Sequence, residues 1–218
     1  MLNWNSIDTV LLDMDGTLLD LHFDNYFWQT HLTQRYAELH RQPYPEVRQR
    51  LTEMFSRVAG TLDWYSLDFW SRELAVDIVQ LKREVEHLIA VHPHAEDFLQ
   101  RLQGKKRLIL VTNAHRKSLQ LKMERTGIAR FFETIISSHD YLKPKEDMRF
   151  WQQLQQELKF DPARTLLVED HIGILDTAHR FGIRHLLAIS RPDSKGELRT
   201  IGRYPAIEHF GELLPFIE

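Results

Sequence analysis

The sequence predicts an α/β protein in which a Rossmann-like parallel sheet carries helices on both faces. Two observations lead to this prediction. From residue 92 onward, short apolar runs alternate with helical segments, and such alternation implies parallel strands joined by right-handed crossovers. Residues 20–91, in contrast, contain helical patterns alone and interrupt the alternation directly after the first apolar run. We therefore expect an α/β core of residues 1–19 and 92–218, and an inserted helical cap of the four-helix-bundle type at residues 20–91.

Five short runs of aliphatic residues are expected to form the strands of the core. These strands lie at residues 7–13, 107–113, 134–137, 165–170 and 184–189. The helices of the core are expected at residues 93–103, in a segment that stops at Gly127, and at residues 148–158, 174–181 and 207–214. Polar and turn residues predict a loop between Ser190 and Tyr204. In an open sheet of this kind, ligands bind at the carboxyl ends of the strands.

The helical cap is predicted from four segments that carry apolar residues at helical spacing. Asp24 is placed to cap a first helix that runs to about Arg41. A second helix begins near Pro45, because proline suits the first turn of a helix. The third and fourth helices are expected at residues 67–74 and 78–89. Short connections between the four segments favour a small bundle.

The composition excludes several classes of function. Hydrophobic residues make up 43% of the chain and charged residues 27%, which is typical of a soluble globular protein. The formal net charge of -3 offers no electrostatic basis for binding nucleic acid or an anionic membrane. The absence of cysteine excludes disulfides, zinc–thiolate sites and a cysteine nucleophile. Neither a signal peptide nor a membrane-spanning apolar run is visible, so a cytoplasmic enzyme is the simplest expectation.

Polar side chains gather at the ends of three expected strands. The first, second and fourth strands end at Asp13 and Asp15, at Thr112 and Asn113, and at Glu169 and Asp170, respectively. Because the carboxyl ends of parallel strands share one edge of a sheet, we expect these side chains to converge. Acids around a hard cation suit Mg²⁺, and a hydroxyl with a lysine nearby suits a phosphoryl group. A solvated Asp-Gly turn is the simpler interpretation of the first pair, but the second acid favours a metal-assisted site.

This arrangement resembles the haloacid dehalogenase-like (HAD) superfamily over nearly the whole chain. The segment Asp13-Met14-Asp15-Gly16-Thr17 looks like its first motif, Thr112 like the second and Glu169-Asp170 like the fourth. The resemblance implies that Asp13 is the nucleophile that forms an aspartyl-phosphate. It also implies that Asp15 protonates the leaving alkoxide and then serves as the base for the attacking water.

The same resemblance implies Mg²⁺ as the cofactor. Its ligands would be Asp13, the backbone carbonyl of Asp15, and Asp170, with Glu169 acting directly or through water. The Thr112 hydroxyl and the backbone amide of Asn113 would hold the phosphoryl oxygens.

Two lysines compete for the third motif. Lys143 with Pro144 matches the Lys-Pro dipeptide that is usual in the superfamily. Counting six residues from Lys145, however, reaches Trp151, which is where the family pattern places an aromatic residue. The choice of Lys145 puts Glu146 where proline is usual. We favour Lys145 and keep Lys143 as the alternative.

Further segments resemble the bacterial GMP/IMP 5′-nucleotidases of this superfamily, most clearly residues 12–21 and 23–28. This resemblance implies a phosphomonoesterase whose substrate is a small molecule, a purine nucleoside 5′-monophosphate. Tyr26, Trp28 and Trp64 offer aromatic faces on which a purine could stack, while packing in the core of the bundle is an equal alternative.

Two other functions stay open at this point. A sugar-phosphate phosphatase or phosphomutase would share every core motif, and only the cap would separate it from a nucleotidase. A non-catalytic binding protein on the same fold would be expected to lack a motif residue, and none is lacking. The sequence predicts neither the oligomeric state nor the preferred base.

Overall fold

The computed structural model describes residues 2–217 and contains one six-stranded sheet whose strands are all parallel. The strands are β1 (Thr9–Leu12), β2 (Arg107–Thr112), β3 (Thr134–Ser137), β4 (Thr165–Glu169), β5 (His185–Ile189) and β6 (Ala206–Ile207). They lie in the order β3-β2-β1-β4-β5-β6, so the order reverses between β1 and β4. The predicted α/β class and parallel sheet are therefore confirmed, and the reversal marks the place where such sheets bind ligands.

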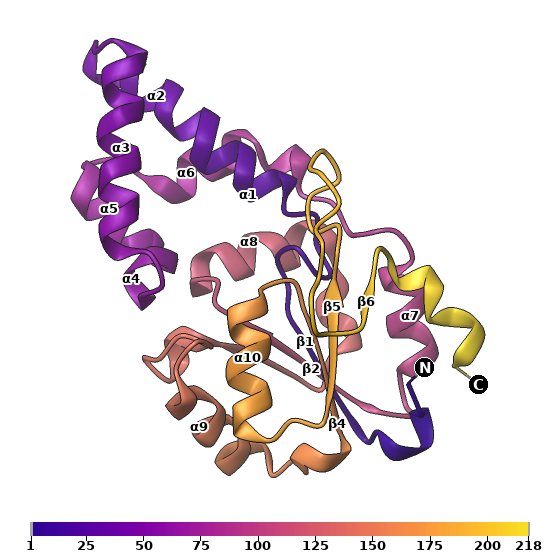
Figure 1. Cartoon of the computed structure of the whole chain (residues 1–218). Coiled ribbons are helices and arrows are strands. Elements are labelled where there is room, and N and C mark those ends of the chain that lie inside the picture. Colours follow the sequence, from indigo (N-terminus) through magenta and orange to yellow (C-terminus); the bar gives the residue numbers. More distant parts are fainter. Residues whose placement is uncertain (1, 218) are drawn as a thin grey trace.

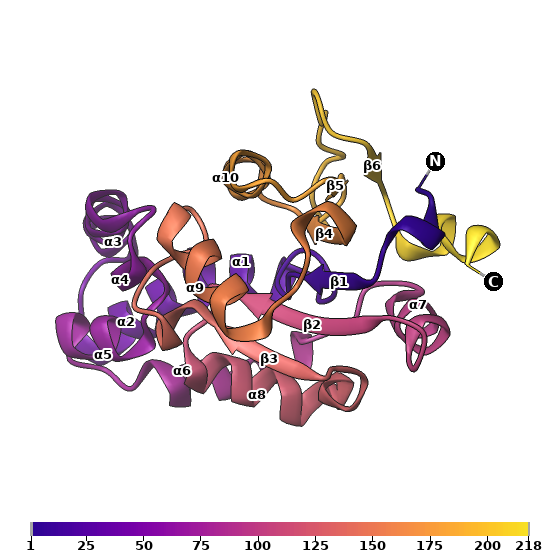
Figure 2. The ribbon, with the colours of Figure 1, turned by 90° about the horizontal axis from the view of Figure 1, so that it is seen from below.

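Strand β1 lies at the centre of the sheet because its side chains are apolar on both faces. Val10 and Leu12 pack into the core on one side and Leu11 into the core on the other, all three fully buried. Helices α7 (Ala95–Leu102) and α8 (Arg116–Thr126) cover the first face, and α9 (Met148–Leu158) and α10 (Ile172–Phe181) cover the second (Figure 2). Burial on both faces explains why β1 reads as a continuous aliphatic run.

The helices between residues 22 and 88, here called the helical unit, stand beyond the carboxyl ends of the strands (Figure 1). Helix α1 (His22–Tyr26) continues through a π-helical turn (Phe27–His31) into α2 (Leu32–His40). The remaining elements are α3 (Tyr44–Val58), α4 (Leu62–Tyr65), α5 (Leu67–Leu74), α6 (Ile78–Glu84) and a 3₁₀ turn (Glu86–Leu88). The arrangement matches the expected helices closely, with α4 as an extra short helix.

Two chain segments connect the helical unit to the core, and they run side by side. The Asp20 N–H donates to the carbonyl of Ala90 at 2.9 Å, and the His92 N–H donates to the carbonyl of Leu18 at 2.8 Å. These antiparallel bonds pair the outgoing and returning chains directly next to the loop that follows β1. The helical unit is thus anchored within a few residues of Asp13 and Asp15.

The structure corrects two expectations about individual elements. Asp24 does not cap the first helix, because it lies within α1 and its carboxylate binds lysine side chains instead. The helix expected at residues 207–214 is wrong: Ala206–Ile207 form β6, and 3₁₀ turns follow at Phe210–Glu212 and Leu214–Phe216. Strand β6 pairs with the edge of β5 that would otherwise be free, and the Ala188 N–H donates to the carbonyl of Pro205 at 2.9 Å.

The expected loop between Ser190 and Tyr204 contains neither helix nor strand. Within residues 2–217, the structure has no helix that is both long and apolar enough to cross a membrane.

Candidate active site

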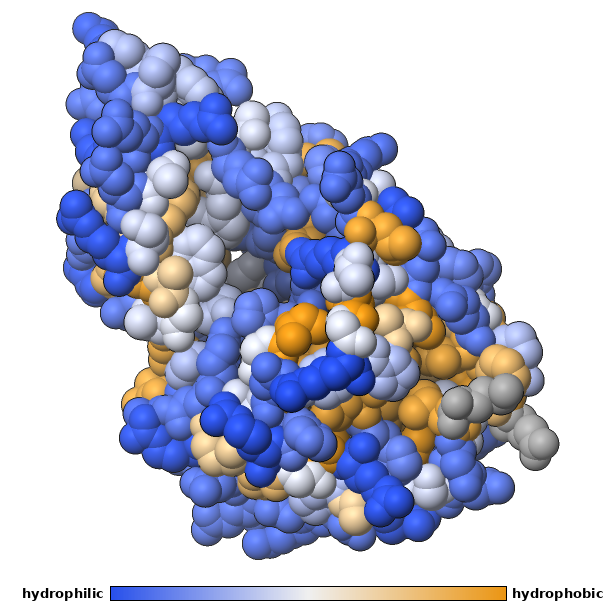
Figure 3. Space-filling model, viewed as in Figure 1, coloured by the Kyte–Doolittle hydropathy of each residue, from blue (hydrophilic) through white to orange (hydrophobic). Residues whose placement is uncertain are grey.

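The polar residues at the strand ends open into one cavity between the core and the helical unit. The cavity has a volume of about 800 Å³ and is lined by residues of both parts of the chain. Figure 3 shows the hollow between them on one face of the molecule. Asp13, Thr112 and Glu169 line it at the ends of β1, β2 and β4. The expected convergence at the sheet edge is therefore present in the structure.

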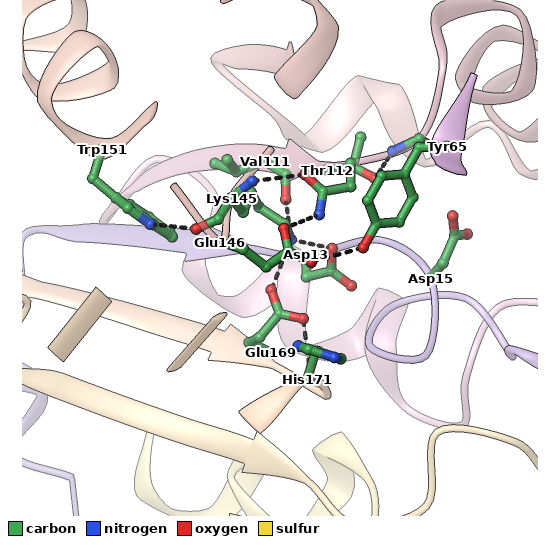
Figure 4. A network of polar contacts seen from close by, with 12 residues as sticks. Asp13, Asp15, Tyr65, Val111, Thr112, Lys145, Glu146, Trp151, Glu169 and His171 are labelled. Carbon is green, nitrogen blue, oxygen red and sulfur yellow. Dashed lines mark hydrogen bonds and ion pairs between the residues drawn. The ribbon is translucent and has the colours of Figure 1, made fainter. Parts of the chain in front are cut away.

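Asp13 directly continues strand β1. Its N–H donates to the carbonyl of Val168 at 3.0 Å, which extends the pairing of β1 with β4 by one residue. The residue is 5% exposed, and its side chain faces Lys145, whose Nζ lies 2.5 Å from Oδ1 (Figure 4). The backbone hydrogen bond and the ion pair together fix the direction of this carboxylate.

Lys145 joins the ends of three strands. Besides Asp13, its Nζ donates to Oε2 of Glu169 at 2.7 Å and to the carbonyl of Val111 at 3.1 Å. Burial of the ammonium opposes its charge, but the two carboxylates outweigh this effect and raise the pKa of Lys145 above its usual value. Trp151 fixes the backbone of this lysine, because its Nε1 donates to the Lys145 carbonyl at 2.8 Å (Figure 4). Of the two candidate lysines, the structure thus brings Lys145 to Asp13.

Lys143, the alternative, lies apart from the described lining of the cavity. The hydrogen bond from Trp151 to the Lys145 carbonyl explains why an aromatic residue lies six positions after this lysine. The same spacing from Lys143 reaches Arg149, whose guanidinium pairs with Asp147.

Asp13, Glu169 and Asp170 form a candidate metal site. One carboxylate oxygen from each lies within 4.8 Å of the other two. Burial, and then repulsion from neighbouring carboxylates, raises the pKa of each to about 7, although Lys145 opposes this shift. Three buried oxygen ligands fit a hard divalent cation such as Mg²⁺, which would offset their repulsion.

Gly16 allows the loop after β1 to pass close to this site. Its φ of +83° is in the left-handed region, and a Cβ atom there would lie 2.8 Å from the carboxyl group of Asp170. Any side chain at this position would therefore push against a candidate metal ligand. This explains why glycine follows the two acids.

Thr112 and Asn113 end strand β2 next to Asp13. The Thr112 hydroxyl accepts a hydrogen bond from the Ala114 N–H at 3.0 Å. The Asn113 amide oxygen accepts from the Lys145 N–H at 2.9 Å, and its Nδ2 donates to Oε2 of Glu146 at 2.9 Å. Both side chains are buried and line the cavity. The second strand end is thus cross-linked to the loop that carries Lys145.

Glu146 also connects the core to the helical unit. The hydroxyl of Tyr65, at the end of α4, donates to Oε1 of Glu146 at 2.8 Å (Figure 4). Burial and the adjacent carboxylate raise the pKa of Tyr65, so this hydroxyl keeps its proton and remains a donor. The residue that stands in place of the usual proline therefore has a structural role.

An aromatic wall, formed by Trp28 and Trp64 with Phe55, is part of the cavity lining. Trp28 and Trp64 both line the cavity, with ring centroids 6.4 Å apart and an interplanar angle of 26°. Phe55 packs edge-on against both rings. Tyr26, which the sequence grouped with the two tryptophans, does not line the cavity and stacks on His31 instead. The structure therefore brings two of the three candidate aromatic residues to the cavity.

Asp15 lines the cavity without joining the group of three acids. Its Oδ1 accepts from Nζ of Lys122 at 2.6 Å. Burial raises its pKa, while Lys122 acts in the opposite direction. The two acids at the end of β1 thus have different surroundings: Asp13 pairs with Lys145 and Asp15 with Lys122.

Comparison with known proteins identifies the family. The sequence model described as haloacid dehalogenase-like hydrolase matches residues 7–182. The chain belongs to the haloacid dehalogenase-like hydrolases. It is 38% identical over 214 residues to the GMP/IMP nucleotidase YrfG of Escherichia coli (strain K12), a match that covers 97% of this chain and 96% of the relative. It is also 29% identical over 174 residues to the pyrophosphatase PpaX of Oceanobacillus iheyensis, covering 76% of each chain.

Solved structures support the same fold. The HAD phosphatase from Thermococcus onnurineus superposes with a TM-score of 0.79 at 20% identity, covering 96% of this chain and 97% of that one. The predicted membership of the HAD superfamily, the resemblance to the nucleotidases and the prediction of an enzyme are confirmed.

In this HAD-like hydrolase, several residues around the cavity carry no sequence pattern that marks them as site residues. They are Asp24, Lys82, Lys122 and Arg199, all of which line the cavity. Arg199 comes from the loop after β5 and donates to Oδ2 of Asp170 at 3.1 Å. For an isolated lysine within a helical pattern, or an arginine within a polar loop, the sequence predicts a solvent-exposed charge. Only the burial of Lys82 and Lys122, at 1% exposure each, sets them apart, and burial follows from packing.

Proposed function

We propose that this protein is a Mg²⁺-dependent phosphomonoesterase that acts on a purine nucleoside 5′-monophosphate, GMP or IMP. The observation that carries the proposal is the composition of the cavity of about 800 Å³ between the core and the helical unit. Its lining combines Asp13 and its acidic neighbours with the aromatic side chains of Trp28 and Trp64. A nucleoside monophosphate has matching parts, an anionic phosphoryl group and a flat base.

In the proposed reaction, an oxygen of Asp13 attacks the phosphorus and the bond from phosphorus to the 5′ oxygen breaks. Asp15 gives its proton to the leaving oxygen, so the nucleoside leaves as a neutral alcohol. Water then attacks the aspartyl-phosphate, and its proton passes to Asp15. Phosphate leaves, and both carboxyl groups return to their starting states.

Other residues of the chain support this chemistry by holding charge and position. Lys145 neutralises charge at Asp13, from which its Nζ is 2.5 Å away. Thr112 and the backbone amide of Asn113 are proposed to bind the phosphoryl oxygens at the end of β2.

HAD-like hydrolases generally use Mg²⁺. Asp13, Glu169, Asp170 and the backbone carbonyl of Asp15 are the proposed ligands, and the three clustered carboxylates provide the oxygen donors that this ion prefers. The bound ion would offset the charge of the phosphoryl group and of the acids around it. Residues 20–91 are proposed to act as a cap that supplies the aromatic wall of the substrate site, and the protein is proposed to work in the cytoplasm.

A substrate screen tests the proposal. The purified protein with Mg²⁺ is assayed for phosphate release from GMP, IMP, AMP, ribose 5-phosphate, glucose 6-phosphate and pyrophosphate. The highest kcat/KM is expected for GMP or IMP. Equal or faster turnover of the sugar phosphates would contradict the nucleotidase assignment and favour a sugar-phosphate phosphatase. No phosphate release from any substrate would instead support a binding protein.

A further inference from the structure

Two buried lysines and two aspartates form a connected network along one wall of the cavity. Nζ of Lys122 lies 2.6 Å from Oδ1 of Asp15 and 2.6 Å from Oδ2 of Asp24. The other oxygen of Asp24 is 2.6 Å from Nζ of Lys82. The order of contacts is therefore Asp15, Lys122, Asp24 and Lys82, and all four residues line the cavity.

The network is held in place by charge balance and burial. Each lysine is 1% exposed, and a buried ammonium is tolerated when carboxylates surround it. With Asp15 ionised, two positive and two negative groups balance. The two inner members, Lys122 and Asp24, each have two partners of opposite charge. The ring of Phe23 adds to this enclosure, because Nζ of Lys82 lies 4.7 Å from its centroid and Nζ of Lys122 lies 5.4 Å from it.

The network joins the two parts of the molecule. Asp15 follows β1 and Lys122 lies on α8, and both belong to the α/β core. Asp24 lies on α1 and Lys82 on α6, and both belong to the helical unit. The contact between Lys122 and Asp24 is therefore a buried ion pair between the core and the helical unit. The same Lys122 ammonium also contacts Asp15.

We propose that Lys122 and Asp24 are positioning residues for proton transfer by Asp15. Lys122 holds Oδ1 of Asp15, which leaves Oδ2 to exchange the proton with the leaving oxygen and with water. Asp24, whose other carboxylate oxygen binds Lys82, holds Lys122 in place. The position of Asp15 therefore depends on how the helical unit packs against the core. This inference rests on the proposed function, because it assumes that Asp15 is the proton donor.

Loss of a well-placed proton donor has a specific kinetic signature. The 5′ alkoxide of a nucleoside is a poor leaving group and must be protonated as it leaves. p-Nitrophenolate is a good leaving group and needs no proton. Substituting Asp24→Asn should therefore lower kcat/KM for GMP and ribose 5-phosphate by about tenfold or more, within the range of general acid catalysis. For p-nitrophenyl phosphate, kcat/KM reports phosphoryl transfer to Asp13 and should stay within about threefold of the wild-type value.

Two further variants separate positioning from a loss of charge or of folding. Lys122→Met removes the direct contact with Asp15 and should show the same selective loss. The double variant Asp24→Asn with Lys82→Met removes one charge of each sign, so the buried network stays neutral. It should also show the selective loss, with an unfolding temperature close to the wild type. This charge-neutral variant decides the question if either single variant folds poorly.

Asp68→Asn is the matched control. Asp68 on α5 pairs with Lys117 on α8 at 2.5 Å, so it also joins the helical unit to the core, but this pair is exposed. Asp68 does not itself line the cavity, and of the described lining residues its carboxylate reaches only His115 at the rim, at 3.7 Å. Its ratio of kcat/KM between GMP and p-nitrophenyl phosphate should match the wild type.

The outcomes distinguish the inference from the proposed function. A selective loss on alkyl phosphates in the network variants, absent from the control, supports the positioning role. Equal losses on both kinds of substrate, or no loss, overturn it while leaving the phosphatase proposal intact. Absence of phosphate release by the wild type from every phosphomonoester overturns both.

Discussion

The ammonium group of Lys145 lies 2.5 Å from Oδ1 of Asp13, although the two residues are 132 positions apart in the chain. The same nitrogen contacts Glu169 at the end of β4, so one cation holds together the acids of two neighbouring strands. The free-energy cost of desolvating the ammonium would by itself disfavour a buried Lys145. The two carboxylates that contact it offset this cost. Removal of Lys145 should therefore affect the site more than any exposed charge in the same loop.

Comparing Lys145→Met with Lys143→Met tests this relationship. The Lys145 variant should lose at least about a hundredfold in kcat, because the charge that neutralises the phosphoryl group is lost. The Lys143 variant should stay within about threefold of the wild type, as expected for a residue away from the cavity. Thermal unfolding of both variants shows whether the loss exceeds the change in folded fraction. A larger loss in the Lys143 variant would reverse the choice between the two lysines.

Replacing Asp13 with asparagine should abolish phosphate release, by about a thousandfold or more, because the amide is not a nucleophile. The buried site should tolerate this change of one atom, so circular dichroism is expected to match the wild type. Brief incubation of the wild type with labelled substrate, followed by acid quenching, should trap a phosphorylated protein that the variant does not form. Turnover near the wild-type rate would show that another group attacks the phosphorus.

Removing divalent cations should stop the reaction, and adding Mg²⁺ should restore it. Binding of the ion should also stabilise the fold, by about 2.7 kcal/mol at a hundred times its Kd. Calorimetry on the wild type and on Asp170→Asn should show weaker Mg²⁺ binding in the variant, which lacks one of the clustered carboxylates. Equal activity with and without the ion would contradict the proposed cofactor.

The aromatic wall should contribute to binding of the base alone. Trp64→Leu is expected to raise KM for GMP by about five- to 150-fold, since stacking contributes about 1–3 kcal/mol per base. KM for ribose 5-phosphate, which has no base, should change little. Tyr26→Leu is the comparison, because Tyr26 lies on the same stretch of helix but apart from the described cavity lining. Similar increases in KM for both substrates would mean that Trp64 stabilises the fold and does not bind the base.

His139 should make the folded state sensitive to acid. Burial, and then the neighbouring His115, lowers its pKa from 6.5 to about 4, and its Nε2 is buried without a hydrogen-bond partner within residues 2–217. A histidine with a lowered pKa binds its proton more readily in the unfolded chain. Its contribution to stability is therefore full above pH 6.5 and is lost as the pH falls towards 4.

The measurement for His139 is denaturant unfolding at pH 7 and pH 5. The wild type should lose about 1–2 kcal/mol from this residue between these values. His139→Gln should reduce that loss, whereas the exposed His40, replaced in the same way, should not. An unchanged pH dependence in His139→Gln would contradict the assignment.

Much of the architecture follows from local sequence. Aliphatic runs buried on both faces define β1, β2 and β4, and helical spacing defines α7 to α10, because both patterns are set by the geometry of neighbouring residues. The end of the chain was mispredicted, since a two-residue strand such as β6 depends on the free edge of β5 rather than on its own sequence.

The family, the parallel sheet and the acids at its carboxyl edge can be predicted from the amino-acid sequence, because the motifs, the strand ends and the turns after them are local features. The folded structure is needed to show which lysine reaches Asp13 and which aromatic residues face the cavity. It is also needed to show that Asp24 binds Lys82 and Lys122 instead of capping a helix. Burial selects the partners of a charge. Whether a lysine is solvated or enclosed by carboxylates depends on how distant segments pack, and spacing along the chain does not record it.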